Sequence, residues 1–161
     1  MPTTAKEGPV TLSVMDRLVD LEPERKLEAA LSRAQSVREL KAALRRDLEW
    51  LLNSRRMIED APASLKEVGR SLYNYGLPDV SSLYLRSPKD QTFLLESIKR
   101  AIEVFEPRLM NVKVRLEPGT DERRVIHFAI EGLLRMDPAP EQVLFDTVLE
   151  PMSGQYQVKG S

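Results

Sequence analysis

The chain has 161 residues, of which 24 are basic and 25 acidic, so its formal net charge is −1. This balance gives no overall attraction to nucleic acid or to an anionic membrane surface. The absence of cysteine excludes disulfides, thiolate chemistry and cysteine-based zinc sites. No stretch approaches the roughly 20 apolar residues of a membrane span, and the N-terminus lacks the apolar run of a signal peptide. We therefore expect a cytoplasmic protein without direct membrane insertion.

The first ten residues differ in character from the rest. Residues 1–10 are polar and contain Pro2, Gly8 and Pro9, which predicts a flexible N-terminal tail. Residues 11–161 have the length of a single domain that buries a core of its own. At the start of this domain, apolar residues recur at helical spacing and predict a short amphipathic helix: Leu12, Met15, Leu18 and Val19.

Two capping boxes predict the next helices. Ser36 and Glu39 have the spacing at which each side chain can bond a backbone N–H of the first turn. The apolar face that follows them continues as far as Leu52. Ser64 and Glu67 repeat the same signal and predict a shorter helix, which we expect to end near residue 76.

A third long helix has the clearest boundaries. Ser87 is a suitable N-cap, and Pro88 falls in the first turn, where its missing N–H has no cost. Pro107 ends the helix, because the residue before a proline is displaced from helical geometry. The apolar stripe between these limits predicts a helix with one buried face.

After Pro107 the apolar period changes from 3.6 to 2. Val112, Val114 and Leu116 alternate with charged residues, which is the pattern of a strand with one buried face. Further strands are predicted over 125–136, with a possible bulge at Gly132, and over 143–149 and 155–158. Helices followed by strands predict an α+β fold, in which N-terminal helices pack on a C-terminal antiparallel sheet of three to four strands.

The sequence offers little material for catalysis. His127 is the single histidine, so a metal site or a serine triad would have to be built around it. Its sequence neighbours supply no ligand cluster, and a structural or solvent-facing role is the better interpretation. The seven glycines are scattered and form no phosphate-binding loop. We predict no catalytic residue, no metal and no cofactor, and a protein that is not an enzyme.

Two other functions stay open as alternatives. A peptidoglycan-cleaving, lysozyme-like enzyme would need two carboxylates about 5–10 Å apart in a cleft, and the 25 acids do not exclude such a pair. A less favoured nucleic-acid-binding module would use two arginine pairs: Arg45, Arg46, Arg55 and Arg56. Four acidic residues in the same stretch weaken the positive electrostatic potential of these arginines: Asp47, Glu49, Glu59 and Asp60. An ordinary charged helix face is therefore the better interpretation.

Several motifs occur in a characteristic order along the chain: 15–18, 45–53 with Arg55, 74–79, 106–109, 145–149 and 153–156. Together they resemble TssE, the baseplate subunit of the bacterial type VI secretion system and a relative of the contractile-phage baseplate wedge protein often labelled lysozyme-like. The resemblance extends from about residue 12 to residue 158. Each motif alone is common, but their order and spacing make the combination specific.

The resemblance implies a structural function. It implies an α+β baseplate subunit beside TssF, TssG and TssK, which contacts the first ring of the TssB/TssC sheath and nucleates or anchors it. It implies a place at the cytoplasmic face of the inner membrane once the baseplate is assembled. It also implies a structural subunit and not a hydrolase, in spite of the lysozyme label.

Glu106, Pro107 and Arg108 are the first predicted partner-binding site. The proline fixes a corner between the third long helix and the first strand, and places a carboxylate and a guanidinium there. Such groups can make charge-assisted, partly bidentate hydrogen bonds to another protein. From the residues alone, an internal salt bridge that ties helix to sheet is favoured. With the resemblance, a role in wedge assembly is favoured.

The last predicted strand is the second partner-binding site. Gln155, Tyr156, Gln157 and Val158 are expected to lie at a sheet edge with unpaired N–H and C=O groups, which is a template for strand addition by another chain. We therefore expect the sheath to attach through this exposed edge.

Overall fold

The computed structural model describes residues 8–19, 24, 31–57, 62, 64–80, 83–84, 87–117, 125–150 and 153–160. The helical elements are α1 (Val14–Leu18), α2 (Arg33–Asn53), α3 (Lys66–Gly69), the 3₁₀ turn η1 (Leu72–Asn74) and α4 (Pro88–Phe105). The strands are β1 (Leu109–Glu117), β2 (Ile126–Leu134), β3 (Glu141–Glu150) and β4 (Gln155–Gly160). The predicted α+β class is confirmed, with four strands described.

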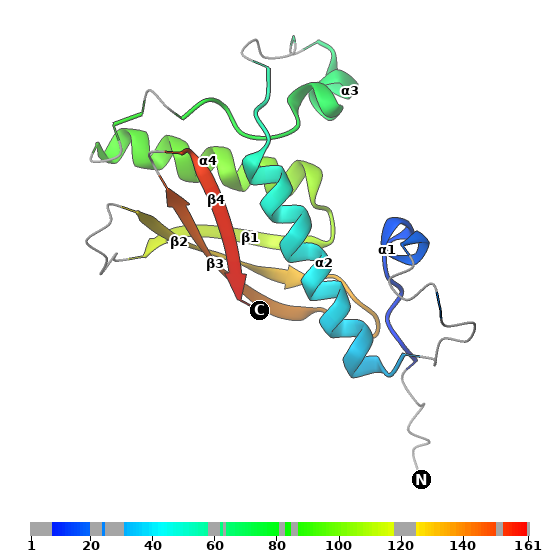
Figure 1. Cartoon of the computed structure of the whole chain (residues 1–161). Coiled ribbons are helices and arrows are strands. Elements are labelled where there is room, and N and C mark those ends of the chain that lie inside the picture. Colours follow the sequence, from blue (N-terminus) through cyan, green and yellow to red (C-terminus); the bar gives the residue numbers. More distant parts are fainter. Residues whose placement is uncertain are drawn as a thin grey trace.

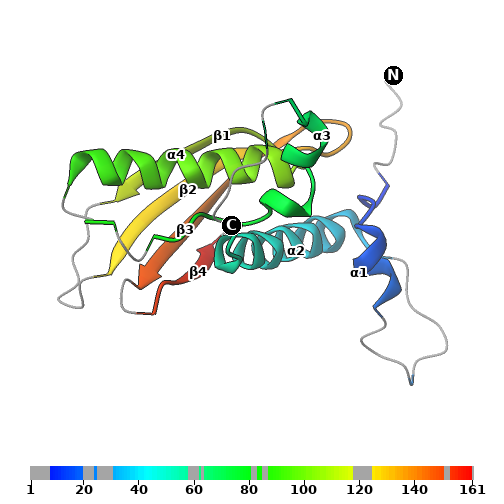
Figure 2. The same cartoon turned by 90° about the horizontal axis from the view of Figure 1, so that it is seen from above.

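The four strands form one antiparallel sheet in the order β1-β2-β3-β4. The long helices α2 and α4 lie against this sheet, α4 over β1 and β2 and α2 beside β4 (Figures 1 and 2). Alternate strand residues point toward the helices and fill the core together with the apolar faces of α2 and α4. The largest fully buried side chains are Tyr156, Phe128, Phe145, Leu44, Leu48, Leu52, Leu77, Leu94, Ile98, Ile102, Ile130 and Leu134.

Helix α2 begins one turn earlier than its sequence signal predicts. Ser32 is the N-cap, and its capping box is completed by Gln35. The predicted cap Ser36 is therefore inside the helix and fully buried. Its Oγ donates to the Arg33 carbonyl (2.8 Å) and accepts a hydrogen bond from the Val10 N–H (2.9 Å). Val10 also packs against the core, so the described end of the predicted tail contacts the domain.

The connection between α2 and α4 is mostly irregular. Ser64 does not cap α3, which has Leu65 at its N-cap position and no side-chain cap. Gly76 has a φ of +102°, and a Cβ there would lie 2.4 Å from the Ser54 carbonyl oxygen. The Leu77 N–H donates to that same oxygen (2.9 Å), so the glycine allows the connection to close against the end of α2.

The predicted bulge lies on the neighbouring strand. The register shifts between Met110 and Lys113 of β1, where Asn111 has a φ of +54°. Gly132 of β2 pairs regularly with Val143, and a Cβ on this glycine would lie 2.7 Å from the Leu109 side chain. The glycine therefore marks a close approach to the irregular part of β1 and not a bulge of its own.

Candidate functional site

The Glu-Pro-Arg corner lies between the end of α4 and the start of β1, as predicted. The two side chains form a bidentate pair: Arg108 Nε donates to Glu106 Oε1 and Arg108 Nη2 to Glu106 Oε2, both at 2.6 Å. Glu106 is buried, while a quarter of the Arg108 side chain is exposed. Two parallel charge-assisted bonds hold the guanidinium in one orientation, so the corner is rigid.

The corner continues into a chain of charges that reaches α1. Arg108 Nη2 also donates to Asp47 Oδ2 of α2 (2.6 Å). Asp47 Oδ1 accepts two bonds from Arg46 (2.8 and 2.9 Å), and Arg46 Nη2 lies 2.8 Å from Asp16 Oδ1 of α1. Acid and base alternate along this chain, so each charge has an opposite neighbour, and three elements distant in the sequence are held together.

The network changes the ionisation of its members. Pairing with Glu106 raises the pKa of Arg108 above its ordinary value, in spite of the opposing effect of burial, and Asp47 adds to the rise. Burial alone would raise the pKa of Asp16, but hydrogen bonds from Ser13 and Arg46 outweigh it and lower that pKa below its ordinary value. Both pKa shifts favour the charged forms of Arg108 and Asp16.

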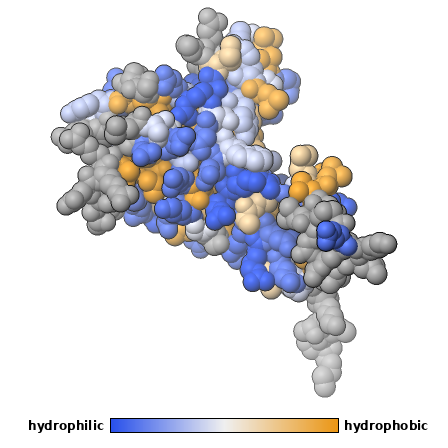
Figure 3. Space-filling model, in the orientation of Figure 1, coloured by the Kyte–Doolittle hydropathy of each residue, from blue (hydrophilic) through white to orange (hydrophobic). Residues whose placement is uncertain are grey.

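A hollow of about 500 Å³ lies beside this corner, between α1 and α2. Its lining includes all three corner residues together with Trp50 and Tyr75. Trp50 is 62% exposed, and the Arg46 guanidinium lies over its ring at 5.1 Å from the centroid. Exposed apolar side chains gather on α1 and at its C-cap: Val14, Met15, Leu18 and Val19. Met15 and Val19 line the hollow. Figure 3 shows an orange, hydrophobic patch in the region of α1. The predicted helix is confirmed, but it has no buried residue.

The β4 edge differs from its prediction. Strand β4 lies at the end of the sheet, as expected, but three of its outward backbone groups are bonded. Asn53 of α2 accepts from the Tyr156 N–H (2.9 Å) and donates to the Tyr156 carbonyl (2.9 Å). Glu49 Oε2, one helical turn away, accepts from the Val158 N–H (3.0 Å). The expectation of unpaired groups is thus wrong for these three groups, because α2 runs beside the strand and bonds them.

The β4 side chains alternate between the core and solvent. Tyr156 and Val158 are buried, while Gln155 and Gln157 are exposed on the opposite face. Burial raises the pKa of Tyr156 to about 12, and nearby Arg55 partly opposes the rise. The side chains available to a partner on β4 are therefore the two glutamines.

The family model described as baseplate wedge protein gp25 matches residues 38–139. This match covers more than half of the chain and includes most of α2, together with α4, the corner and the first two strands. The chain belongs to the baseplate wedge protein gp25 family. Among solved structures, a chain of "The baseplate complex from the type VI secretion system" is similar, with 18% sequence identity, a TM-score of 0.46, and coverage of 77% of this chain and 97% of that chain. A comparison with curated proteins gives no match.

Family membership gives the wedge protein a structural role in a baseplate. Where the chain is described, no helix is both long and apolar enough to cross a membrane. In the same residues no group of three or more histidine, cysteine or acidic side chains is arranged to hold a metal ion. His127 pairs in register with Glu117 and Val148, and its Nε2 is buried without a hydrogen-bond partner among the described residues.

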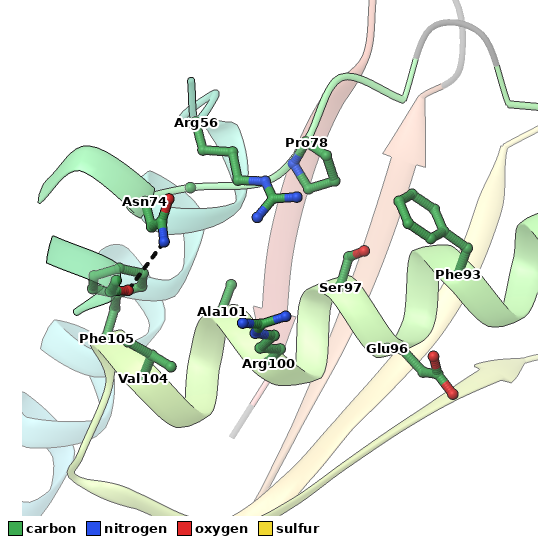
Figure 4. Close-up of a pocket in the computed structure, with 12 residues that line it drawn as sticks. Arg56, Asn74, Pro78, Phe93, Glu96, Ser97, Arg100, Ala101, Val104 and Phe105 are labelled. Carbon is green, nitrogen blue, oxygen red and sulfur yellow. Dashed lines mark hydrogen bonds between the residues drawn. The ribbon is translucent and has the colours of Figure 1, made fainter. Parts of the chain in front are cut away.

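The arginine pairs of the wedge protein are largely engaged inside the fold. Arg46 belongs to the corner network, and Arg55 donates to the carbonyls of Gly154 (2.7 Å) and Leu52 (3.2 Å). Arg56 lines a second hollow, of about 300 Å³, where it faces Arg100 of α4 (Figure 4). Arg46 and Arg55 are therefore engaged by partners within the fold, while Arg45 is exposed.

Sequence reasoning missed the residues of α2 that hold both predicted sites. Asp47 bonds the corner, and Glu49 and Asn53 bond β4. All three fall inside the second motif of the TssE resemblance, at residues 45–53. Glu49 and Asn53 are four residues apart and therefore share one helix face, which was the available signal for a common task.

Proposed function

We propose that this wedge-family chain is a structural component of the type VI secretion system baseplate. In this proposal it works in the cytoplasm, at the cytoplasmic face of the inner membrane once the baseplate is assembled. It assembles there with the wedge subunits TssF, TssG and TssK. It also nucleates or anchors the first ring of the TssB/TssC sheath through an edge of its sheet. The order of motifs shared with TssE supports the secretion system over a phage tail.

One observation carries this proposal: exposed apolar side chains surround a rigid charged corner in a chain of the baseplate wedge family. Met15 is 68% exposed and Trp50 is 62% exposed, although both are large and apolar, and both line the hollow beside the corner. Contiguous exposed apolar surface beside polar residues is typical of a protein–protein interface. The corner residues Glu106, Pro107 and Arg108 line the same hollow, so a partner seated there would meet all three.

A pull-down from a secretion-competent cell tests the wedge contact. We expect Met15→Asp to reduce recovery of TssF and TssG at least tenfold, because it places a charge in the proposed apolar interface. The substitution should leave the unfolding midpoint unchanged, since Met15 is exposed. Leu72→Asp is the matched control, because Leu72 is 84% exposed and lies on η1, outside the hollow lining. Equal recovery with both variants would refute an interface at α1.

A sheath assay tests the second half of the proposal. In cells that lack this protein we expect few or no assembled sheaths, with recovery on expression of the wild-type chain. Sheaths that assemble and contract at normal frequency in the deletion strain would refute the role in the apparatus. Clearing of purified peptidoglycan by the wild-type protein, lost on changing one specific acid, would instead support the lysozyme-like alternative.

A further inference from the structure

The second hollow, of about 300 Å³, lies between α4 and the connection that follows α2 (Figure 4). Four of its lining residues share one face of α4, because they are spaced three or four positions apart: Phe93, Ser97, Arg100 and Val104. This face stands beside the one that α4 buries in the core. Helix α4 therefore offers a second face to a ligand.

Two guanidinium groups face this hollow from opposite walls. Arg100 is exposed on α4 and has no hydrogen bond or ion pair among the described residues. Arg56 reaches toward it from the connection, where the Arg56 N–H donates to the Leu77 carbonyl (3.0 Å) and so fixes this wall. Glu96 lies one turn before Arg100, but its carboxylate points away from it (Figure 4). Since like charges repel each other, an anion between the two arginines is favoured.

Exposed apolar side chains flank the charged centre of the hollow. Phe93 is 45% exposed and Val104 is 39% exposed. They lie about 16 Å apart along the helix axis, with Arg100 one turn from Val104 and two turns from Phe93. A small inorganic anion would leave both side chains in water, whereas a protein segment would cover them. The hollow thus fits an acidic residue that stands between two apolar ones.

This hollow adjoins the one beside the Glu-Pro-Arg corner. Phe105, the last residue of α4, lines both hollows. Its ring packs edge-on against that of Tyr75, with 5.2 Å between the centroids, and Tyr75 also lines the corner hollow. One aromatic pair therefore separates the two hollows at the end of α4. A partner seated at the corner needs only to pass this pair to reach Arg100.

We propose that the partner seated at the corner extends a segment into the second hollow, and that this segment carries an acidic residue between two apolar residues. The carboxylate accepts charge-assisted hydrogen bonds from Arg100 and Arg56. A guanidinium has five N–H donors, so Arg56 can bond the segment and keep its contact within the fold. The apolar residues cover Phe93 and Val104. The identity of the partner as a wedge subunit rests on the proposed function, whereas the chemistry of the segment follows from the hollow.

Binding of the full chain to a purified TssF–TssG complex tests the inference. We expect Arg100→Ala to weaken binding at least fivefold. Lys99→Ala is the matched control and should stay within twofold of wild type, because Lys99 is also an exposed cation of α4 but lies outside the hollow lining. Both variants should keep the wild-type unfolding midpoint. Equal affinity of Arg100→Ala and wild type, or equal losses in the two variants, would overturn the inference and leave the proposed function intact. Failure of the wild type to bind would overturn both.

The salt dependence of the same binding separates a direct ion pair from a general attraction. The affinity of the wild type should fall as the ionic strength rises, and that of Arg100→Ala should fall less steeply. Equal slopes would contradict a carboxylate at Arg100. Inorganic phosphate is the probe for a free anion. If phosphate binds at Arg100 and TssF–TssG binding is insensitive to Arg100→Ala, the hollow is a small-anion site and the inference is wrong.

A photo-crosslinker at the rim of the hollow identifies the segment. Phe93→p-benzoylphenylalanine keeps an aromatic side chain there, and the peptide that it captures from the TssF–TssG complex is identified by mass spectrometry. We expect a peptide with an aspartate or glutamate between apolar residues. Changing that acid to its amide should weaken binding to wild type at least fivefold and should not weaken binding to Arg100→Ala further. A captured peptide without an acid, additive losses, or capture of a second copy of this chain would overturn the inference.

Discussion

The two edges of the sheet are treated differently by the rest of the molecule. At β4, side chains of α2 bond the outward backbone groups, so the edge strand is supported as if by another strand. At β1, the other end of the sheet, no side chain among the described residues bonds a backbone group of the strand. Unpaired strand edges attract other chains, and proteins commonly cover those that are not used.

The same helix also fixes the start of β1. Asp47 of α2 bonds Arg108, which lies immediately before that strand. Helix α2 is therefore tied to both edge strands of the sheet, to β4 directly and to β1 through Arg108. The difference between the edges thus depends on the position of one helix. Substitutions on the α2 side should therefore affect the stability of the fold more than substitutions on the β1 side.

The largest effect is expected at the corner. Arg108→Ala leaves the Glu106 carboxylate buried without its bidentate partner and removes the contact to Asp47. We expect the free energy of unfolding to fall by about 2–4 kcal/mol, measured by urea denaturation. Arg108→Lys keeps the charge but not the planar fork, so its loss should be smaller. A loss below about 1 kcal/mol for the alanine variant would contradict a role of the corner in tying α2 to the sheet.

The pH dependence of unfolding tests how well the core face of β4, where the Tyr156 side chain lies, is shielded from water. The folded protein raises the pKa of Tyr156 to about 12, above the ordinary value of 10.0. A raised pKa means that the buried phenol stabilises the fold below pH 10, and that this contribution is lost as the pH rises from 10 to 12. The loss should reach at most about 3 kcal/mol. It is measured by urea denaturation across this range.

Tyr156→Phe is the control for that experiment. The Tyr156 hydroxyl is buried without a hydrogen-bond partner among the described residues, so its removal should cost little at neutral pH. The alkaline loss should shrink in this variant. If wild type and variant lose stability equally between pH 10 and 12, the Tyr156 hydroxyl is more accessible to solvent than the structure indicates.

The fold was predictable from sequence to a large extent because its signals are local. Period-2 alternation, Ser87-Pro88 and Pro107 identified the strands and both ends of α4. The start of α2 was missed because Ser32 and Ser36 both offer cap chemistry, and the contact with Val10 that buries Ser36 is distant in the sequence. Local capping rules cannot rank two such serines.

The candidate site was predicted in part. The corner was found because a proline between two opposite charges is a local signal. The bond between Arg108 and Asp47 joins residues 61 positions apart, and the bond between Tyr156 and Asn53 joins residues 103 positions apart. A sequence pattern can indicate that a strand lies at an edge, but whether a helix side chain reaches that edge is decided by tertiary packing.

A smaller effect is expected when the α2 side chain that bonds the backbone of β4 is removed. Asn53→Ala leaves the Tyr156 N–H and carbonyl without their side-chain partner. We expect a loss of about 2 kcal/mol in urea denaturation, and faster exchange of the Tyr156 amide. Glu49→Gln is a matched control at the same edge, since glutamine retains the oxygen that accepts from Val158 and should cost less. Unchanged exchange at Tyr156 in the alanine variant would mean that another group protects this edge.

The smallest effect is expected on the β1 side. Lys113 is exposed and has no ion pair in the described part of the chain, so Lys113→Ala should change the free energy of unfolding by less than about 0.5 kcal/mol. Lys41 of α2 is the matched comparison, because it pairs with Glu141 at 2.7 Å and its side chain is 20% exposed. Lys41→Ala should cost about 1 kcal/mol, measured by the same urea denaturation. If Lys113→Ala costs as much as Lys41→Ala, the lysine has a partner inside the fold. The β1 edge would then be as well supported as the β4 edge, and the distinction between the two edges would fail.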